Sequence, residues 1–100
     1  MSEQQIEVVI GNKKGLHARA AAKFVRTVEL FNTPVMVAKV SGLGVVAGVE
    51  PAEVSGGSIL GLMMLGAECG SKLRLRVDGG QADEITSALK KLIEEKFGEE

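Results

Sequence analysis

Histidine occurs only once in this chain of 100 residues, at His17, and Arg19 follows it two positions later. A neutral imidazole is a good nucleophile at physiological pH. A guanidinium group meets phosphate oxygens through a fork of N–H donors. These two residue types at this spacing predict that His17 accepts a phosphoryl group and that Arg19 stabilises it.

The position of His17 supports the same chemistry. It lies between a glycine-containing turn, GNKKG, and a helical pattern that starts at Ala18. The first backbone N–H groups of a helix have no partner inside the helix, and helix starts therefore attract anions. We expect the N–H groups of Ala18, Arg19 and Ala20 to donate to a phosphate carried by His17.

A less specific interpretation of these residues stays open. A single histidine near a helix start is more often a capping or surface residue than a nucleophile, and short motifs are weak evidence. Lys23 and Arg26 continue the helical spacing of Arg19. This basic stripe is a candidate partner-binding surface, and it is also compatible with a solvated helix face.

The first half of the chain predicts a strand, a helix and a second strand. Residues 6–10 alternate as a strand does. The helix from Ala18 shows the spacing of a buried stripe, and the Asn32-Thr33-Pro34 run stops it. A second strand is expected over 35–40, followed by a glycine-rich segment at about 41–57 with a third strand near 52–55. The predicted buried stripe consists of Ala21, Phe24, Val25 and Val28.

The second half predicts a short helix, a strand and a long helix. Ser58 can cap the short helix ILGLMML, which ends at Gly66. In residues 72–77 the side chains alternate, with leucine and valine on one side and Lys72, Arg74 and Arg76 on the other. A last helix is expected over 82–97. Its predicted buried residues are Ile85, Ala88, Leu89, Leu92 and Phe97.

This order of elements predicts an α+β fold. Four strands in an antiparallel sheet would carry three helices on one face and leave the other face to water. A length of 100 residues fits one domain, over residues 1–100.

Composition excludes several function classes. The net charge of −1 gives no overall attraction to nucleic acid, and the basic row of residues 72–76 has no aromatic side chain to stack bases. The single cysteine, Cys69, fits a reducing compartment and offers no metal site. No stretch has the ~20 apolar residues of a membrane span, and the N-terminus lacks the pattern of a secretion signal. We expect a cytoplasmic protein without metal or membrane insertion.

Three stretches resemble one protein family. GLHARAAAKF resembles the active-site segment GLHARPA of HPr, the histidine-containing phosphocarrier of the bacterial phosphoenolpyruvate-dependent sugar phosphotransferase system. SILGLMMLG, at residues 58–66, resembles the regulatory-serine segment of that family. KLRLRVDGGQADEITSALKKLIEE resembles its last strand and last helix. The resemblance implies an open-faced β-sandwich with the order βαββαβα, as read above.

The resemblance also implies roles for individual residues. His17 would be phosphorylated on Nδ1, with Arg19 helping to stabilise and transfer the group. Ser58 would be the serine that a dedicated kinase, the HPr kinase/phosphorylase, modifies in some bacteria. Leu60 and Met63 would lie beside the histidine in the partner-binding patch, although helix residues of this kind are by default core.

The implied partners are proteins. Enzyme I would donate the phosphoryl group and an enzyme IIA domain would accept it. The protein itself would be a monomeric carrier rather than an enzyme and would need no cofactor.

Two departures from the family pattern stand out. Ala20 replaces the usual proline; since proline is favoured but not required in a first helical turn, we expect the site to survive. The glycine-rich segment at about 41–57 is longer than the family pattern. It could form a flexible hairpin tip or contact a partner.

Three functions follow from these observations. The first is a phosphocarrier that feeds sugar uptake. The second is a regulatory member of the family that controls a partner through phosphorylated His17 or Ser58. The third is a protein-binding module whose histidine never reacts. The sequence names neither the sugar nor the acceptor.

Overall fold

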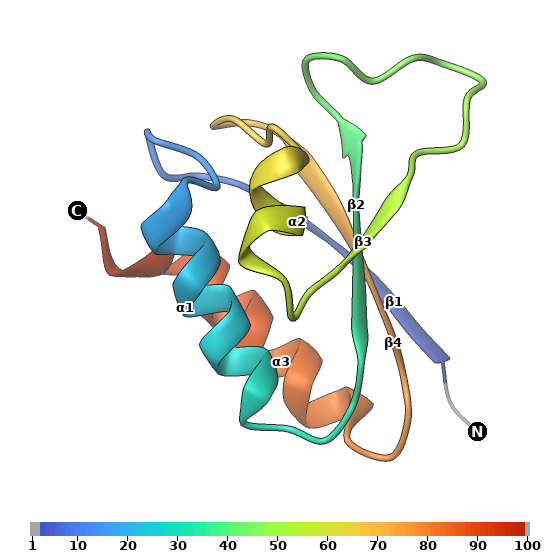
Figure 1. The fold of residues 1–100 in the computed structure, drawn as a ribbon, viewed down its shortest axis with the longest axis vertical. Coiled ribbons are helices and arrows are strands. Elements are labelled where there is room, and N and C mark those ends of the chain that lie inside the picture. Colours follow the sequence, from blue (N-terminus) through green and yellow to red (C-terminus); the bar gives the residue numbers. More distant parts are fainter. Residues whose placement is uncertain (1–2, 100) are drawn as a thin grey trace.

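The structure is a computed structural model of the chain and describes residues 3–99. Its elements follow the predicted order (Figure 1). They are β1 (Glu3–Val9), α1 (Ala18–Glu29), β2 (Val35–Ser41), β3 (Glu53–Ser55), α2 (Ile59–Met64), β4 (Lys72–Asp78), α3 (Ala82–Glu94) and a final 3₁₀ turn (Lys96–Gly98). The fold class is therefore α+β, with the order βαββαβα that was predicted.

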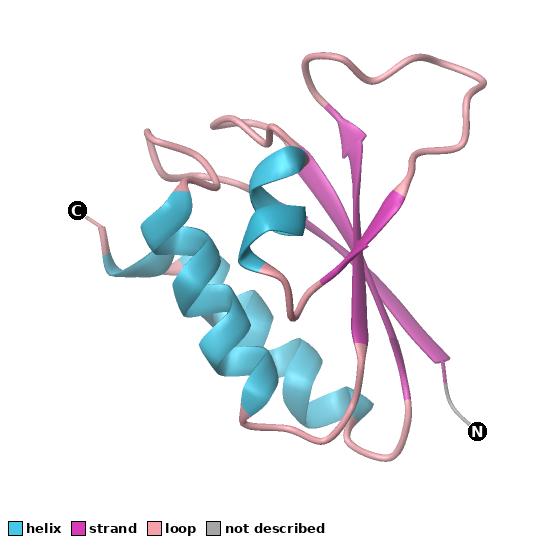
Figure 2. Cartoon of the chain, viewed as in Figure 1, coloured by secondary structure: helices cyan, strands magenta, loops and turns pink. Residues whose placement is uncertain are grey.

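The four strands form one antiparallel sheet in the order β1-β4-β2-β3. All three helices cover the same face of this sheet, and the other face is left without a helix (Figure 2). The fold is an open-faced β-sandwich. This arrangement places the start of α1 beside the start of the chain's final tail, near one end of the helical layer (Figure 1).

The core lies between the sheet and the helices. On β4, Leu73, Leu75 and Val77 are fully buried, as their alternation predicted. The predicted stripe of α1 is buried as well, with Phe24 at its centre. Burying one large apolar side chain contributes roughly 1.5–3 kcal/mol, so these two facing stripes hold α1 on the sheet and fix where its N-terminus lies.

The prediction for the last helix was partly wrong. α3 ends at Glu94 rather than at Phe97, because Lys96 and Phe97 adopt left-handed backbone angles with φ of 58° and 57°. This break turns the chain back toward α1. Phe97 is fully buried as predicted, and Ile93 joins it in the core, whereas Ala88 and Leu92 are only partly buried.

The basic row on β4 is not a simple solvated surface. Lys72 pairs with Glu7, Arg74 with Glu50, and Arg76 with Glu3 and Glu53. The Arg76 guanidinium makes two contacts of 2.8 Å with the Glu53 carboxylate, and it holds the pKa of that carboxyl below its usual value. These carboxylates neutralise the row, which removes the electrostatic basis for nucleic-acid binding.

No helix between Glu3 and Glu99 is long and apolar enough to cross a membrane.

Candidate functional site

Gly15 sets the entry of the chain into the site. Its φ of 69° lies in the left-handed region that favours glycine, and a Cβ there would lie 2.5 Å from the Ala67 carbonyl oxygen. The next residue, Leu16, donates its N–H to that same oxygen at 2.9 Å. The turn is thereby fastened to the segment after α2, and His17 follows at a fixed position.

His17 is the N-cap residue of α1. Its Nδ1 accepts a hydrogen bond from the Arg19 N–H at 3.2 Å, and its Nε2 contacts Oε2 of Glu99. A ring nitrogen that accepts carries a lone pair, and a neutral imidazole then bears its proton on the other nitrogen. The two contacts together assign the proton to Nε2 and the free lone pair to Nδ1, which is the nitrogen expected to be phosphorylated.

Glu99 is held in place by more than the histidine. Its Oε1 accepts a hydrogen bond at 3.0 Å from Nδ2 of Asn12, a residue that is 1% exposed. The Asn12 hydrogen bond and then the His17 contact keep the pKa of the Glu99 carboxyl below its usual value. The carboxylate beside His17 is therefore ionised at neutral pH.

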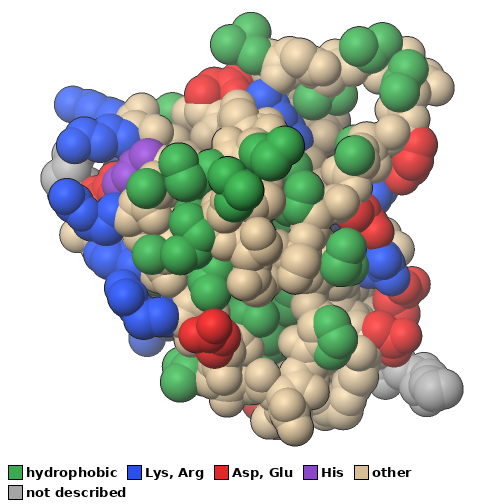
Figure 3. Space-filling model, viewed as in Figure 1, with side chains coloured by type: hydrophobic (Ala, Val, Ile, Leu, Met, Phe, Trp, Pro, Cys, Tyr) green, Lys and Arg blue, Asp and Glu red, His purple; other side chains and the backbone are tan. Residues whose placement is uncertain are grey.

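Cationic side chains surround a hollow of about 350 Å³ beside the tail. It is lined by Lys13, Lys14, Arg19 and Lys23, together with Gly98 and Glu99. Figure 3 shows basic side chains gathered along this side of the molecule, next to the single histidine. The predicted residue Arg19 is exposed here. The positive surroundings suit a doubly charged phosphoryl group.

The backbone donors behave in two ways. The Arg19 N–H is already bonded to His17 Nδ1, whereas no partner for the N–H groups of Ala18 and Ala20 lies among residues 3–99. Orphan donors of this kind at a helix start are available to an anion. A proline at position 20 would supply one donor fewer.

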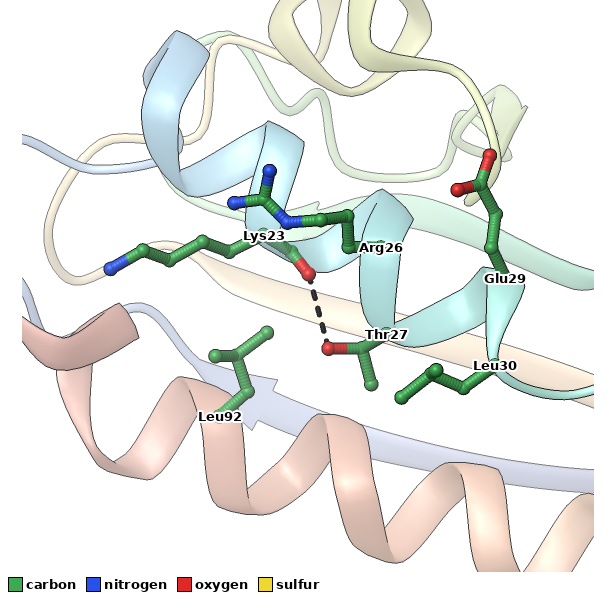
Figure 4. Close-up of a pocket in the computed structure, with 6 residues that line it drawn as sticks. All are labelled: Lys23, Arg26, Thr27, Glu29, Leu30 and Leu92. Carbon is green, nitrogen blue, oxygen red and sulfur yellow. Dashed lines mark hydrogen bonds between the residues drawn. The ribbon is translucent and has the colours of Figure 1, made fainter.

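Lys23 and Arg26 of the basic stripe lie in different environments. Lys23 is half-buried and its Nζ donates to the Phe97 carbonyl oxygen at 2.6 Å, while Arg26 is exposed. Both also line a shallow hollow between α1 and α3, with Thr27, Glu29, Leu30 and Leu92 (Figure 4). The lining of that hollow does not include His17. Its Thr27 hydroxyl donates to the Lys23 carbonyl oxygen and its Lys23 ammonium donates to the Phe97 carbonyl oxygen, so we assign it no reactive role.

Comparison with known proteins decides the family. A family model described as the PTS HPr component phosphorylation site matches residues 4–95. A phosphocarrier protein HPr from Neisseria meningitidis is 41% identical over 99 residues, which cover 99% of this chain and 98% of the relative. This chain belongs to the HPr family. It is a phosphocarrier protein of the phosphotransferase system and not an enzyme.

Other HPr proteins agree with this assignment. The phosphocarrier protein HPr of Pseudomonas aeruginosa is 42% identical over 95 residues, which cover 94% of this chain and 94% of the relative. The crystal structure of HPr-C-His from Thermoanaerobacter tengcongensis superposes with a TM-score of 0.80 at 37% identity, covering 97% of this chain and 98% of that one. The family and the fold predicted from the sequence are therefore confirmed.

Ser58 has the capping role that was predicted. Its Oγ accepts a hydrogen bond from the Gly61 N–H at 3.0 Å at the start of α2. Gly61 packs closely against two side chains, since a Cβ on it would lie 3.2 Å from that Oγ and 3.3 Å from the Val54 Cβ. Whether Ser58 is also a regulatory residue of this HPr stays a prediction.

The helix α2 divides its apolar residues between core and surface. Leu62 is fully buried, whereas Leu60 and Met63 are 69% and 43% exposed. Ile59 and Met64 are exposed as well. In Figure 3 this hydrophobic patch lies next to the histidine. Of the two interpretations left open for Leu60 and Met63, the structure favours a surface patch, and exposed apolar patches commonly mark interaction sites.

Sequence reasoning missed Asn12 and Glu99. Asn12 lies in a turn-forming run and Glu99 in an acidic tail, and neither has a local pattern that points to His17. Glu99 is 87 residues from Asn12 and 82 residues from His17. Only the folded chain brings them together.

Proposed function

We propose that His17 is the phosphoryl acceptor of this HPr and reacts through Nδ1. The main support is a pair of contacts at the N-terminus of α1: Glu99 contacts Nε2 of His17, and the Arg19 N–H donates to Nδ1. Together they leave the lone pair on Nδ1. Arg19 and the N–H groups of Ala18 and Ala20 then bind the phosphoryl oxygens. When the group arrives, the Arg19 N–H passes from Nδ1 to a phosphoryl oxygen.

The proposed exchange runs between proteins. Enzyme I donates the phosphoryl group and an enzyme IIA domain accepts it. The apolar patch on α2, which includes Leu60 and Met63, provides the contact area. Arg26 and Lys23 on α1 add positive charge to the surface that meets the partner. A partner with an apolar centre and an acidic border would be complementary to this surface. We further propose a cytoplasmic location, which these partners require and which the exposed free Cys69 supports, because thiols stay reduced in that compartment.

The decisive experiment is phosphorylation of the purified chain with enzyme I and phosphoenolpyruvate. We expect a single phosphoryl group that mass spectrometry maps to His17 and that mild acid removes, since phosphohistidine is acid-labile. The variant His17→Ala should stay unmodified. If enzyme I phosphorylates a second HPr but leaves this chain unmodified, the protein is a binding module and the proposal is wrong.

A further inference from the structure

The tail after α3 is built to deliver one carboxylate to the histidine. Phe97 is fully buried and anchors the tail in the core, with its backbone in the left-handed region. Its carbonyl oxygen accepts the hydrogen bond from Lys23 on α1. The buried Phe97 ring and the Lys23 hydrogen bond hold the tail before Glu99, and Asn12 and His17 contact its carboxylate. The Glu99 side chain is therefore only 18% exposed, although it lies at the end of the described chain.

Asn12 orients the carboxylate. The Asn12 Nδ2 group donates to the Gly15 carbonyl oxygen at 2.8 Å and to Glu99 Oε1 at 3.0 Å. The amide is thus fixed by the same turn that positions His17. An amide, a carboxylate and an imidazole therefore form one connected chain, in which each group fixes the orientation of the next. A carboxylate that holds the remote ring nitrogen of a functional histidine is a general way to select one tautomer.

We propose that Glu99 is a positioning residue for phosphoryl transfer. It holds the proton of His17 on Nε2, so that the Nδ1 lone pair stays free, and it balances the positive charge that the ring acquires on phosphorylation. The inference rests on the proposed role of His17 as acceptor. In this proposal Glu99 selects the tautomer of the ring and stabilises its positive charge, while Arg19 and the helix N–H groups bind the phosphoryl oxygens.

The transfer step balances without any proton movement. The Nδ1 lone pair forms a bond to phosphorus, the bond between phosphorus and the donor group breaks, and the donor keeps that electron pair. The ring, which still has its Nε2 proton, becomes a cation beside the Glu99 carboxylate. In the return step the Nδ1–phosphorus bond breaks, the electron pair goes back to Nδ1, and the leaving group is a neutral imidazole. Neutral leaving groups depart more readily than anionic ones, so the retained proton favours this step.

The tautomer can be measured directly on the unmodified protein. Because the chain has one histidine, its two ring ¹⁵N signals are unambiguous. At a pH where the ring is neutral, we expect the wild-type shifts of a ring protonated on Nε2. In Glu99→Ala the shifts should move toward a mixture of both tautomers. Glu99→Gln keeps an oxygen that can accept from Nε2 and should retain more of the wild-type tautomer than Glu99→Ala does.

Reactivity is measured with a donor that needs no docking surface. Inorganic phosphoramidate transfers its phosphoryl group to histidine, and ³¹P NMR distinguishes the Nδ1 from the Nε2 product. We expect Glu99→Ala to phosphorylate on Nδ1 on the order of ten-fold more slowly than wild type, by analogy with the loss seen when the partner that orients a metal-ligating histidine is removed. Glu99→Gln should fall between the two, because it retains the hydrogen bond and loses the charge.

Glu95→Gln is the matched control. Glu95 is an exposed glutamate of the same tail, and its change to glutamine removes the same charge. We expect wild-type ¹⁵N shifts and a wild-type rate for it. Thermal unfolding of every variant checks that the fold is kept. The proposal is overturned if Glu99→Ala shows the wild-type tautomer, or if it phosphorylates on Nδ1 at the wild-type rate.

The two proposals fail in distinguishable ways. A wild-type chain that enzyme I does not phosphorylate on His17 contradicts the proposed function. The ¹⁵N comparison of wild type with Glu99→Ala is made without any phosphoryl donor, and it decides independently whether Glu99 sets the tautomer.

Discussion

At the scale of single residues, the groups that hold the imidazole are separate from those that we propose to bind the phosphoryl group. Asn12 and Glu99 are engaged with the ring and its turn. Arg19, by contrast, is exposed, and its side chain makes no ion pair or hydrogen bond within residues 3–99. A side chain without structural contacts can act on a ligand at little cost to the fold.

Arg19→Ala should therefore slow phosphorylation of His17 by enzyme I while the free energy of unfolding changes by less than about 0.5 kcal/mol. Stopped-flow transfer rates and thermal unfolding measure the two effects separately. Lys90→Ala, which removes an exposed cation from α3, is the control and should change neither. If Arg19→Ala transfers the phosphoryl group at the wild-type rate, Arg19 has no role in phosphoryl transfer.

At the scale of elements, α2 combines a cap and a contact surface within one short helix. Ser58 satisfies the Gly61 N–H at its start, and Leu62 fixes the helix to the core. Ile59, Leu60, Met63 and Met64 are exposed, and Figure 3 shows hydrophobic surface next to the histidine. A charge added at Ser58 would therefore lie at the edge of the contact surface and not in the core.

Ser58→Ala and Ser58→Asp separate these two roles. Ser58→Ala loses the cap and should lower the free energy of unfolding by on the order of 1 kcal/mol, with phosphorylation of His17 by enzyme I unchanged. Ser58→Asp retains a capping oxygen and should unfold like wild type, while its charge beside Leu60 and Met63 slows that phosphorylation. If enzyme I phosphorylates His17 equally fast in Ser58→Asp and in wild type, Ser58 acts only as a helix cap.

At the scale of the whole molecule, one polar network joins segments that are distant in sequence. Lys39, at the bulged end of β2, is 8% exposed, and its ammonium contacts the carbonyl oxygens of Leu43 and Gly66 and the carboxylate of Glu68. Glu68 also accepts from the Leu43 N–H and from the Ser71 hydroxyl. The base of the glycine-rich loop at 42–52 is thereby tied to the end of α2, although the side chains of Leu43, Val46 and Val49 in this loop are exposed.

This network predicts a specific dependence of stability on pH. Hydrogen bonds from the Leu43 N–H, Lys39 and Ser71 lower the pKa of Glu68 from its usual 4.5 to about 2. Since the folded state binds this proton less readily than the unfolded state, the contribution of Glu68 is present above pH 4.5 and is lost as pH falls toward 2. Glu68→Gln should be less stable than wild type at neutral pH, and the difference in Tm should shrink through that window.

Thermal unfolding of both proteins as a function of pH measures this difference. A Tm difference that stays constant from neutral pH to pH 2 would show that the network does not depend on the charge of Glu68.

The sequence by itself determined the order of the elements and the family, and it singled out His17 as the residue predicted to react. Local rules were sufficient for these features, since the alternation in β4, the buried stripe of α1 and the Ser58 cap all depend on residues within a few positions of one another. The motif around His17 is equally local.

The tertiary structure decided what surrounds that histidine. The sequence predicted one continuous last helix, but left-handed angles at Lys96 and Phe97 turn the tail back across α1 and bring Glu99 to the ring. The same holds for the carboxylates that neutralise the basic row of β4 and for the Lys39–Glu68 pair. All of these contacts join segments more than twenty residues apart, and their partners become neighbours only when burial of the apolar core packs the helices on the sheet.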